Sequence, residues 1–201
     1  MPDIHKILVG ENETKINIFR VAAKLFAEKG YNGVSMREIS EKSKVSKPTI
    51  YYYFGSKEGV FKDLVKVGLQ YGSAQAKQIA SINIPVKERL VKIIQNRFFI
   101  SFEHPDFSKF FLMVFMTSEN LPFLNEFQKQ ANIHRQLLVD LIQEGVDSSE
   151  FGAGANPQLA AEIIAAVLGH FIGKQLREKK KILTDELAEE IIELLFKGLN
   201  E

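Results

Sequence analysis

Apolar side chains recur at intervals of three and four positions along almost the whole chain, and no other pattern in the sequence narrows the possible folds as much. This spacing follows the turn of an α-helix and lines up the side chains on one of its faces. The alternation of half-buried β-strands is nearly absent, and only 6 of the 201 residues are proline. The sequence therefore predicts an all-α protein of about nine helices.

Residues that typically begin or end a helix predict where each of these helices begins and ends. The first helix is predicted from about Glu13 to Lys29, because Gly30 is a typical stop. Ser35 and Ser46 can cap the second and third helices by accepting a hydrogen bond from a backbone N–H three residues on. The later helices are predicted at about 57–79, 85–103, 106–118 and 121–145, from 157 onward and from 184 onward.

The formal net charge of +1 hides an uneven distribution along the chain. Residues 1–66 hold 12 Lys and Arg against 8 Asp and Glu, whereas the remaining residues hold 14 against 17. The absence of cysteine excludes disulfide bonds and cysteine-based zinc sites, and it fits a reducing cytoplasm. We see no secretory signal, and the longest apolar stretches, 110–116 and 163–173, are shorter than the roughly 18 residues of a spanning helix. We therefore expect a cytoplasmic protein with a basic N-terminal unit and no membrane partner.

The sequence contains no set of residues typical of catalysis or metal binding. Its four histidines lie apart, and none pairs with another at the spacing of a helical zinc hydrolase. The segment "GAGAN" at 152–156 lacks the Lys-Ser/Thr of a phosphate-binding loop. We therefore predict no catalytic residue, no metal and no cofactor. A helical enzyme with an apolar substrate site is the rival class.

Residues 35–54 have the layout of a helix-turn-helix DNA reader, in which two short helices follow a longer one and are joined by a tight turn. Helical spacing lines the inner side with Ile39, Val45, Ile50 and Phe54. The three tyrosines at 51–53 span about 200° of helix surface, so one core cannot bury them all. A tyrosine ring packs on a sugar or a thymine methyl, and its hydroxyl donates to a phosphate. The alternatives are that the tyrosines pack against the fourth helix or form a face that binds another protein.

Over about residues 13–62 the sequence resembles the TetR family of bacterial transcriptional regulators, most clearly in the run "IFRVAAKLFAEKGYNGVSMREISEKSKVSKPTIYYYFGSKEGVF". This run combines Lys29-Gly30-Tyr31 at a helix end with Val45-Ser46-Lys47 at a turn and Lys57-Glu58 at the next helix. The resemblance implies a three-helix helix-turn-helix DNA-binding domain at 1–57. It also implies a larger C-terminal helical bundle for ligand binding and dimerisation at 58–201.

The family pattern implies roles on double-stranded DNA residue by residue. Phosphates would be met by Ser35, Tyr52, Tyr53 and Lys57, and base edges by Lys47, Pro48, Thr49 and Tyr51. Ser46 would cap the reading helix and is also a predicted DNA contact, Arg37 can reach the DNA backbone, and Lys47 is the best candidate for guanine. Two residues depart from the pattern, because Lys44 stands where the family usually has glycine and Ser40 where it has alanine. If the turn needs a left-handed backbone, a lysine there costs about 1–2 kcal/mol.

Phenylalanine is concentrated in the middle of the chain, where residues 98–127 hold nine of the 16. An aromatic stripe at helical spacing forms either a core or a pocket for an apolar small molecule, and in TetR-like proteins this region holds the inducer pocket. The candidate ligand contacts are Asn96, Phe99, Phe102, His104, Phe110, Phe111, Met113, Phe115, Phe127 and His134.

The last two predicted helices are apolar on more than one face, and they carry small residues that permit close helix approach, among them Ala165 and Gly169. They would pair with their twins in a homodimer, as the family implies, or else close the core of one subunit. We therefore expect a ligand-responsive, homodimeric DNA-binding regulator with a palindromic operator, most simply a repressor released by an apolar inducer. The alternative is a helical protein-interaction module that uses the tyrosine face. The choice between repressor and activator stays open.

Overall fold

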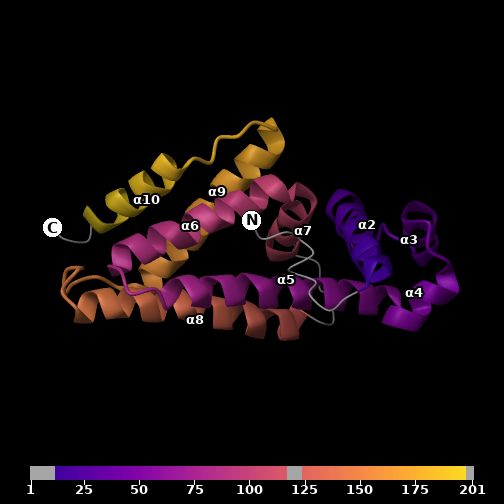
Figure 1. Ribbon diagram of the computed structural model, residues 1–201, viewed down its shortest axis with the longest axis horizontal. Helices are drawn as coiled ribbons and strands as arrows, with labels where there is room; N and C mark the ends of the chain where they lie inside the picture. Colours follow the sequence, from indigo (N-terminus) through magenta and orange to yellow (C-terminus); the bar gives the residue numbers. More distant parts are fainter. Residues whose placement is uncertain (1–11, 117–123, 198–201) are drawn as a thin grey trace. The chain divides into compact units, whose positions relative to one another are not determined.

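The computed structural model describes residues 12–116 and 124–197, and all regular structure in them is α-helical (Figure 1). The helices are α2 (Glu13–Lys29), α3 (Met36–Ser43), α4 (Lys47–Phe54), α5 (Lys57–Ala80), α6 (Val86–Glu103), α7 (Pro105–Met116), α8 (Leu124–Asp147), α9 (Pro157–Glu178) and α10 (Asp185–Lys197). The prediction of an all-α fold is confirmed, with nine helices in these residues. The expected end of one helix at 118 and start of the next at 121 lie outside the described residues.

The helix ends follow local side-chain capping. Ser35 Oγ accepts from the Glu38 N–H, and Ser46 Oγ accepts from the Thr49 N–H, as the sequence predicted. Asn156 caps α9 in the same way, with Pro157 in its first turn, where a missing N–H costs little. Gly30 ends α2 with a φ of 68°. These caps satisfy backbone groups that have no partner inside their own helix, so each boundary is fixed by a few neighbouring residues.

The chain packs into two compact units, which are discontinuous in sequence. Unit 1 comprises residues 1–71 and 104–127, and unit 2 comprises residues 72–103 and 128–201. The boundary therefore falls within α5. The division into functional domains at residue 57 is a different kind of division, and it stays a prediction.

Unit 1 is held together by a cluster of phenylalanine rings. Phe26 on α2 meets Phe61 on α5 edge to face, with ring centroids 5.1 Å apart, and Phe61 meets Phe110 on α7 in the same way at 5.2 Å. These three rings are almost fully buried, and α7 lies against α2 (Figure 1). Edge-to-face aromatic pairs add to the free energy gained by burying apolar area. Part of the aromatic stripe in the sequence is therefore the core of this unit.

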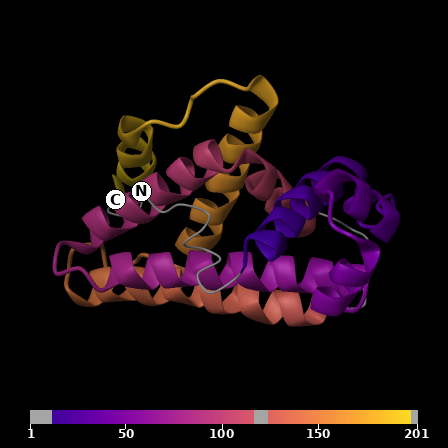
Figure 2. The ribbon, with the colours of Figure 1, turned by 45° about the vertical axis from the view of Figure 1, so that its right-hand side comes forward.

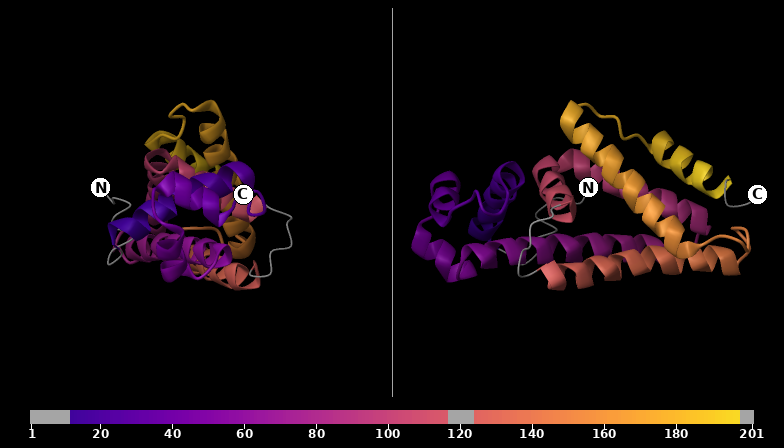
Figure 3. Two further views of the ribbon diagram at one scale, coloured as in Figure 1. Left: turned by 90° about the vertical axis from the view of Figure 1, so that its right-hand side faces the viewer. Right: turned by 180° about the vertical axis from the view of Figure 1, so that it is seen from behind.

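Unit 2 is built around α6. Figure 1 shows α10 beside α6, and α9 crosses α6 in Figure 2 and Figure 3. Gln175 on α9 is buried, its Nε2 donates to Ser101 Oγ on α6, and its Oε1 accepts from the N–H groups of Ile182 and Leu183. One amide thus ties α6 to the segment that joins α9 and α10.

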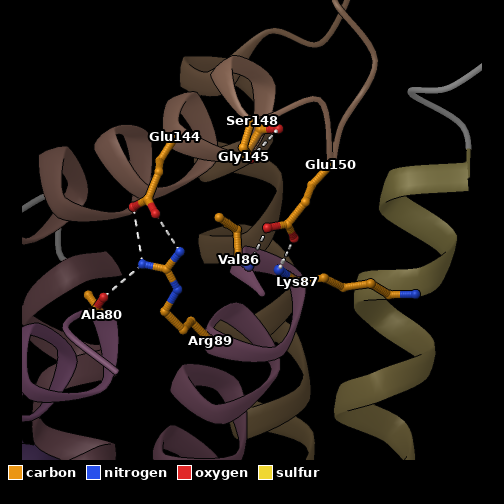
Figure 4. Close-up of polar contacts among 8 residues, drawn as sticks. All are labelled: Ala80, Val86, Lys87, Arg89, Glu144, Gly145, Ser148 and Glu150. Atoms are coloured by element: carbon orange, nitrogen blue, oxygen red, sulfur yellow. Dashed lines mark hydrogen bonds and ion pairs between the residues drawn. The ribbon is translucent and has the colours of Figure 1, made fainter. Parts of the chain in front are cut away.

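A second polar cluster fixes the start of α6 (Figure 4). Arg89 is nearly buried, and its guanidinium donates to both carboxylate oxygens of Glu144 on α8, at 2.5 and 3.1 Å, and to the Ala80 carbonyl at 2.9 Å. Glu150 accepts from the N–H groups of Val86 and Lys87 in the first turn of α6. A carboxylate at that position is favourable, because the first N–H groups of a helix have no partner within it and carry partial positive charge.

Helix α9 is apolar over a length that could cross a membrane, judged by length and composition alone within the described residues. Core helices of soluble proteins pass the same test, so this is weak evidence for a membrane span. In the most apolar stretch of 18 residues within α9, only 22% of the residues are buried within the chain. The rest of α9 is half-buried or exposed in the single chain, and its exposed apolar residues include Leu159 and Ile163.

We expect Glu144→Gln to destabilise the protein near pH 7 but not in acid. The hydrogen bond from Arg89 holds the pKa of Glu144 below its usual value. The pair therefore stabilises the folded state above the unfolded-state pKa of about 4.3, and the stabilisation is lost as the pH falls through the lower folded-state pKa. Glu144 is half-exposed, so solvent screening limits the expected loss to about 1 kcal/mol.

Urea unfolding from about pH 7 to pH 3 measures this difference. Glu193→Gln is the matched control, because its ion pair with Lys87 is exposed on both sides, and we expect it to change stability by less than about 0.5 kcal/mol. A difference between Glu144→Gln and the wild type that does not shrink in acid would contradict the assignment.

Candidate DNA-reading surface

The turn between α3 and α4 has the left-handed backbone that the sequence left open. Lys44 has φ 57° and ψ 24°, in the left-handed region that glycine adopts most easily. A side chain in this region costs about 1–2 kcal/mol. The turn therefore keeps its left-handed conformation with lysine in place of the usual glycine, and other contacts must offset the strain.

Side chains around the turn supply such contacts. Ser40 Oγ donates to the Val45 carbonyl at 2.6 Å, and Asn17 Nδ2 donates to the Ser43 carbonyl at 2.7 Å. The Val45 N–H donates to Ser43 Oγ at 3.3 Å. Ser40 thus makes a bond that alanine could not make. The sequence marked Ser40 only as a departure from the family pattern, and it contained no signal for Asn17, which lies on α2.

The inner side of the helix-turn-helix is packed as predicted. Ile39 and Ile50 are fully buried, Phe54 is almost so, and Val45 packs against the same core. Phe54 lies against Phe19 of α2, with ring centroids 5.2 Å apart. This packing determines which side of α4 is left for solvent.

The outer side of α4 carries its exposed residues. Tyr51 is 47% exposed and Tyr52 is 85% exposed, and Lys47 and Pro48 are exposed as well. We call Lys47, Pro48, Tyr51 and Tyr52 the reading face. Thr49 is half-buried, and its Oγ1 lies 2.7 Å from Ser46 Oγ, which also accepts from the Thr49 N–H. Ser46 is therefore the cap of α4, while DNA contacts by Ser46 and Thr49 stay predictions.

Tyr53 differs from the two tyrosines before it. It is half-buried and packs against the core of unit 1, and its hydroxyl accepts a hydrogen bond from Asn12 Nδ2 at 2.5 Å. Because the hydroxyl oxygen is the acceptor in this bond, the hydroxyl proton is not used by it and can be donated to another group. Packing of Tyr53, one of the alternatives from the sequence, is therefore observed, and its predicted phosphate contact stays a prediction.

Ser35 and Lys57 have structural partners in the absence of DNA. Ser35 caps α3 and is exposed. Lys57 is half-buried, its Nζ donates to the Tyr31 carbonyl at 3.0 Å, and it lies 4.3 Å from the centre of the Tyr31 ring. These contacts tie the start of α5 to the loop after α2. Phosphate binding by Ser35 and Lys57 stays a prediction.

Arg37 is paired with an acid on its own helix. Its Nε donates to Glu41 Oε1 at 2.7 Å, which raises the pKa of Arg37. The pKa of Glu41 is lowered, mainly by this hydrogen bond and the charge of Arg37, and also by the charge of Lys47. Glu41 therefore stays ionised at neutral pH close to two of the predicted DNA contacts.

The candidate ligand contacts in unit 1 differ in exposure. Phe110 is fully buried in the phenylalanine core, and the tip of the half-buried Phe111 ring occupies the space where a side chain at Gly68 would stand. His104 and Met113 are half-buried, and Phe115 is 56% exposed. For Phe110 the structure gives a packing role, and ligand contacts by these five residues stay predictions.

The remaining candidates lie on α6 and α8. Asn96, Phe99 and Phe102 follow one another at three-residue intervals on α6 in unit 2, where the first two are half-buried and Phe102 is exposed. The side chains of Phe127 and His134 lie outside those that the structure describes. In the described part of the chain, no three His, Asp or Glu side chains are grouped so that they could hold a metal ion.

Known proteins share this fold and its DNA-binding segment. The family model described as bacterial regulatory proteins of the tetR family matches residues 18–64. The fatty acid metabolism regulator protein of Bacillus subtilis is 21% identical over 92% of this chain and 95% of its own length.

Two solved structures are similar over almost their whole length. The fatty acid degradation regulator FadR of Bacillus halodurans superposes with a TM-score of 0.83 at 20% identity, over 95% of this chain and 98% of that one. FadR of Bacillus subtilis, solved in complex with stearoyl-CoA, superposes with a TM-score of 0.80 at 22% identity, over 91% of this chain and 98% of that one. At this identity the likeness shows a shared fold.

We expect Glu41→Gln to strengthen binding to duplex DNA. The substitution removes a negative charge that lies beside Arg37 and acts on Lys47, so both cations become more available to phosphates. The expected gain in affinity is about two- to fivefold at low salt, and it shrinks as salt is added. Fluorescence anisotropy with a labelled duplex measures it. Glu190→Gln, an exposed acid on α10, is the control, and an equal gain in the control would mean that only net charge matters.

Proposed function

The chain belongs to the TetR family of bacterial regulatory proteins, and on that premise we propose that it is a repressor that binds a palindromic operator as a homodimer and leaves it when an apolar small molecule binds. As a member of this family it is a DNA-binding transcriptional regulator and not an enzyme. The observation that carries the proposal is the outward direction of Lys47, Tyr51 and Tyr52 on a short helix whose other side is buried. Its place of action is the cytoplasm, where bacterial DNA lies.

The reading face has the chemistry that a major groove requires. Lys47 at the start of α4 supplies a cation for the acceptors on a guanine edge. The rings of Tyr51 and Tyr52 supply apolar surface for sugars or thymine methyl groups, and their hydroxyls donate to phosphates. An α-helix fits the major groove, so α4 enters it with these residues in front, and Arg37 and Ser35 face the backbone beside it.

A second copy of the chain covers the exposed apolar residues of α9 and α10. Leu159 and Ile163 on α9 and Leu194 on α10 are exposed, and Leu194 is 74% so. A side chain at Gly169 would meet nothing within 4 Å in the single chain, so another helix can approach closely there. A symmetric pair of reading faces explains why the operator is palindromic.

The ligand is a compound with a long hydrocarbon chain. Aromatic and methionine side chains predominate among the candidate contacts, and pockets for small molecules are mostly apolar. The names of two similar proteins point the same way, because one is a fatty acid metabolism regulator and another was solved with stearoyl-CoA. A hundredfold loss of operator affinity on binding requires about 2.7 kcal/mol of coupling between the two sites.

The alternative is a protein-interaction module in which Tyr51 and Tyr52 bind another protein. It is favoured by one observation, the large exposed ring of Tyr52. The two functions differ in their dependence on salt. Binding through several phosphates weakens steeply with added salt, whereas an aromatic protein contact changes little.

Selection of binding sites from a random duplex library with the purified protein tests the DNA-binding function. We expect a palindromic consensus. Lys47→Ala and Tyr51→Ala should each lower the affinity for it by about 1–3 kcal/mol, because each removes a base contact. Lys180→Ala, which removes an exposed lysine in unit 2, should bind as the wild type does. Enrichment of no sequence, or binding that salt leaves unchanged, would favour the protein-interaction module.

Sedimentation equilibrium tests the homodimer. We expect a species of twice 22.8 kDa at micromolar protein, and Leu159→Glu with Leu194→Glu should shift it to the monomer, because two charges would be buried in the interface. Ile82→Glu is the matched control, since Ile82 is an exposed apolar residue that belongs to neither α9 nor α10. A monomeric wild type would refute the homodimer. A double variant that is still dimeric would show that the interface does not lie at Leu159 and Leu194.

A further inference from the structure

The lysine in the turn between α3 and α4 is a residue type that the backbone of the turn does not favour. Lys44 has φ 57°, in the left-handed region, where glycine carries no steric cost. Among the other residue types, Asn and Asp adopt this region most easily, because their short polar side chains can bond to the nearby backbone. The long side chain of lysine lacks this advantage. Its presence therefore calls for a reason beyond the turn itself.

Neither packing nor pairing within the protein supplies that reason. The Lys44 side chain is exposed, and in the described part of the chain it has no hydrogen bond and no ion pair. Other cations of the same region are paired with acids. Lys29 Nζ bonds to Glu38, and in the same way Arg37 Nε bonds to a carboxylate, that of Glu41. What Lys44 adds to the turn is therefore a positive charge in solvent.

Neighbouring side chains hold the turn in its strained conformation. Asn17 Nδ2 donates to the Ser43 carbonyl, and Ser40 Oγ donates to the Val45 carbonyl, on either side of Lys44. Strained residues persist where the surrounding structure over-determines the backbone, and they are concentrated at functional sites. The lysine thus leaves the backbone from a fixed position, two residues before the cap of α4.

The turn and the reading helix form a segment without acids. Residues 42–57 contain four lysines and no Asp or Glu. Lys42, Lys44 and Lys47 are all exposed and lie within six residues of one another. The acid that precedes them, Glu41, is already engaged in an ion pair on its own helix. A cluster of charges of one sign attracts the phosphates of a duplex and gains affinity by releasing their counterions.

We propose that Lys44 Nζ binds a phosphate of duplex DNA beside the groove that α4 enters, a contact that glycine at this position could not make. The inference rests on the proposed reading face, because Lys44 lies three residues before Lys47. A phosphate suits a lysine on a turn, since the ammonium group acts as a point charge on a flexible stem. Phosphate contacts position a protein without reading sequence, so Lys44 contributes equally to every duplex.

Fluorescence anisotropy with the full-length protein tests this contact on two labelled duplexes, the selected operator and a shuffled sequence of the same composition. Lys44→Gln removes the charge and keeps a side chain in the turn. We expect it to weaken binding to both duplexes by the same factor, about three- to tenfold at about 50 mM salt. The slope of log affinity against log salt should become shallower by about 0.9. Lys44→Arg keeps the charge and should keep both affinity and slope.

Lys44→Gly separates the charge from the backbone strain. It removes the charge and relieves the strain, so the melting temperature should rise by about 2–4 °C while the affinity for DNA falls as it does in Lys44→Gln. A residue with a structural role alone would not lower affinity when the fold becomes more stable. Lys179→Gly is the matched control, because Lys179 is also an exposed lysine in the left-handed region, with φ 53°, and it ends α9 in unit 2. It should raise the melting temperature and leave DNA binding unchanged.

The outcomes separate this inference from the proposed function. An unchanged salt slope in Lys44→Gln, or an equal loss of affinity in Lys179→Gly, overturns the phosphate contact and leaves the DNA-binding regulator standing. A loss that is confined to the operator also overturns it, because such a loss indicates a base contact. A wild type that binds neither duplex overturns the reading face, and the role of Lys44 falls with it.

Discussion

A helix of eight residues does not hold its shape alone in water, so α4 depends on the two side chains that it buries, Ile50 and Phe54. Phe54 lies against Phe19, and Ile50 is fully enclosed in the same core. With these two residues directed inward, the helical repeat directs Pro48 and Tyr52 outward and leaves Tyr51 and Lys47 on the flank, where both are exposed. The surface that we propose for DNA is thus a consequence of packing on its opposite side, and the same two residues set its stability and its orientation.

The tight turn before α4 illustrates how a local cost is offset by groups further away. Lys44 adopts a conformation that suits glycine better. Ser40 and Asn17 bond to carbonyls on either side of it, and neither bond follows from the residues of the turn alone. Lys44 and Ser40 both depart from the family pattern. The hydroxyl of Ser40 bonds to the residue that follows Lys44, so the second departure helps to offset the cost of the first.

The helices and their ends were predictable because the causes lie within a few residues. Ser35, Ser46 and Asn156 cap the helices that follow them, and Gly30 ends the helix before it. The inner side of the helix-turn-helix followed from spacing for the same reason.

The partners of Tyr53, Lys57 and Arg89 could not be predicted, because each lies far away in the sequence. Periodicity also placed Phe110 and Phe115 in one aromatic stripe without telling that the first is buried and the second exposed. Which residues pack against a given helix face depends on the tertiary fold. The periodicity of a single sequence does not contain that information.

The phenylalanine core of unit 1 has a consequence for the synthesis of the protein. Phe26 and Phe61 leave the ribosome early, but their partner Phe110 belongs to α7, which is translated only after the whole of α6. A nascent chain that ends before α7 exposes apolar rings that the finished unit covers, and such intermediates are prone to aggregate. Helices α2 to α5 are thus made before α7, yet the core that they share with α7 is completed only when α7 has been made as well. A gene fragment cut after α4 would face the same difficulty permanently.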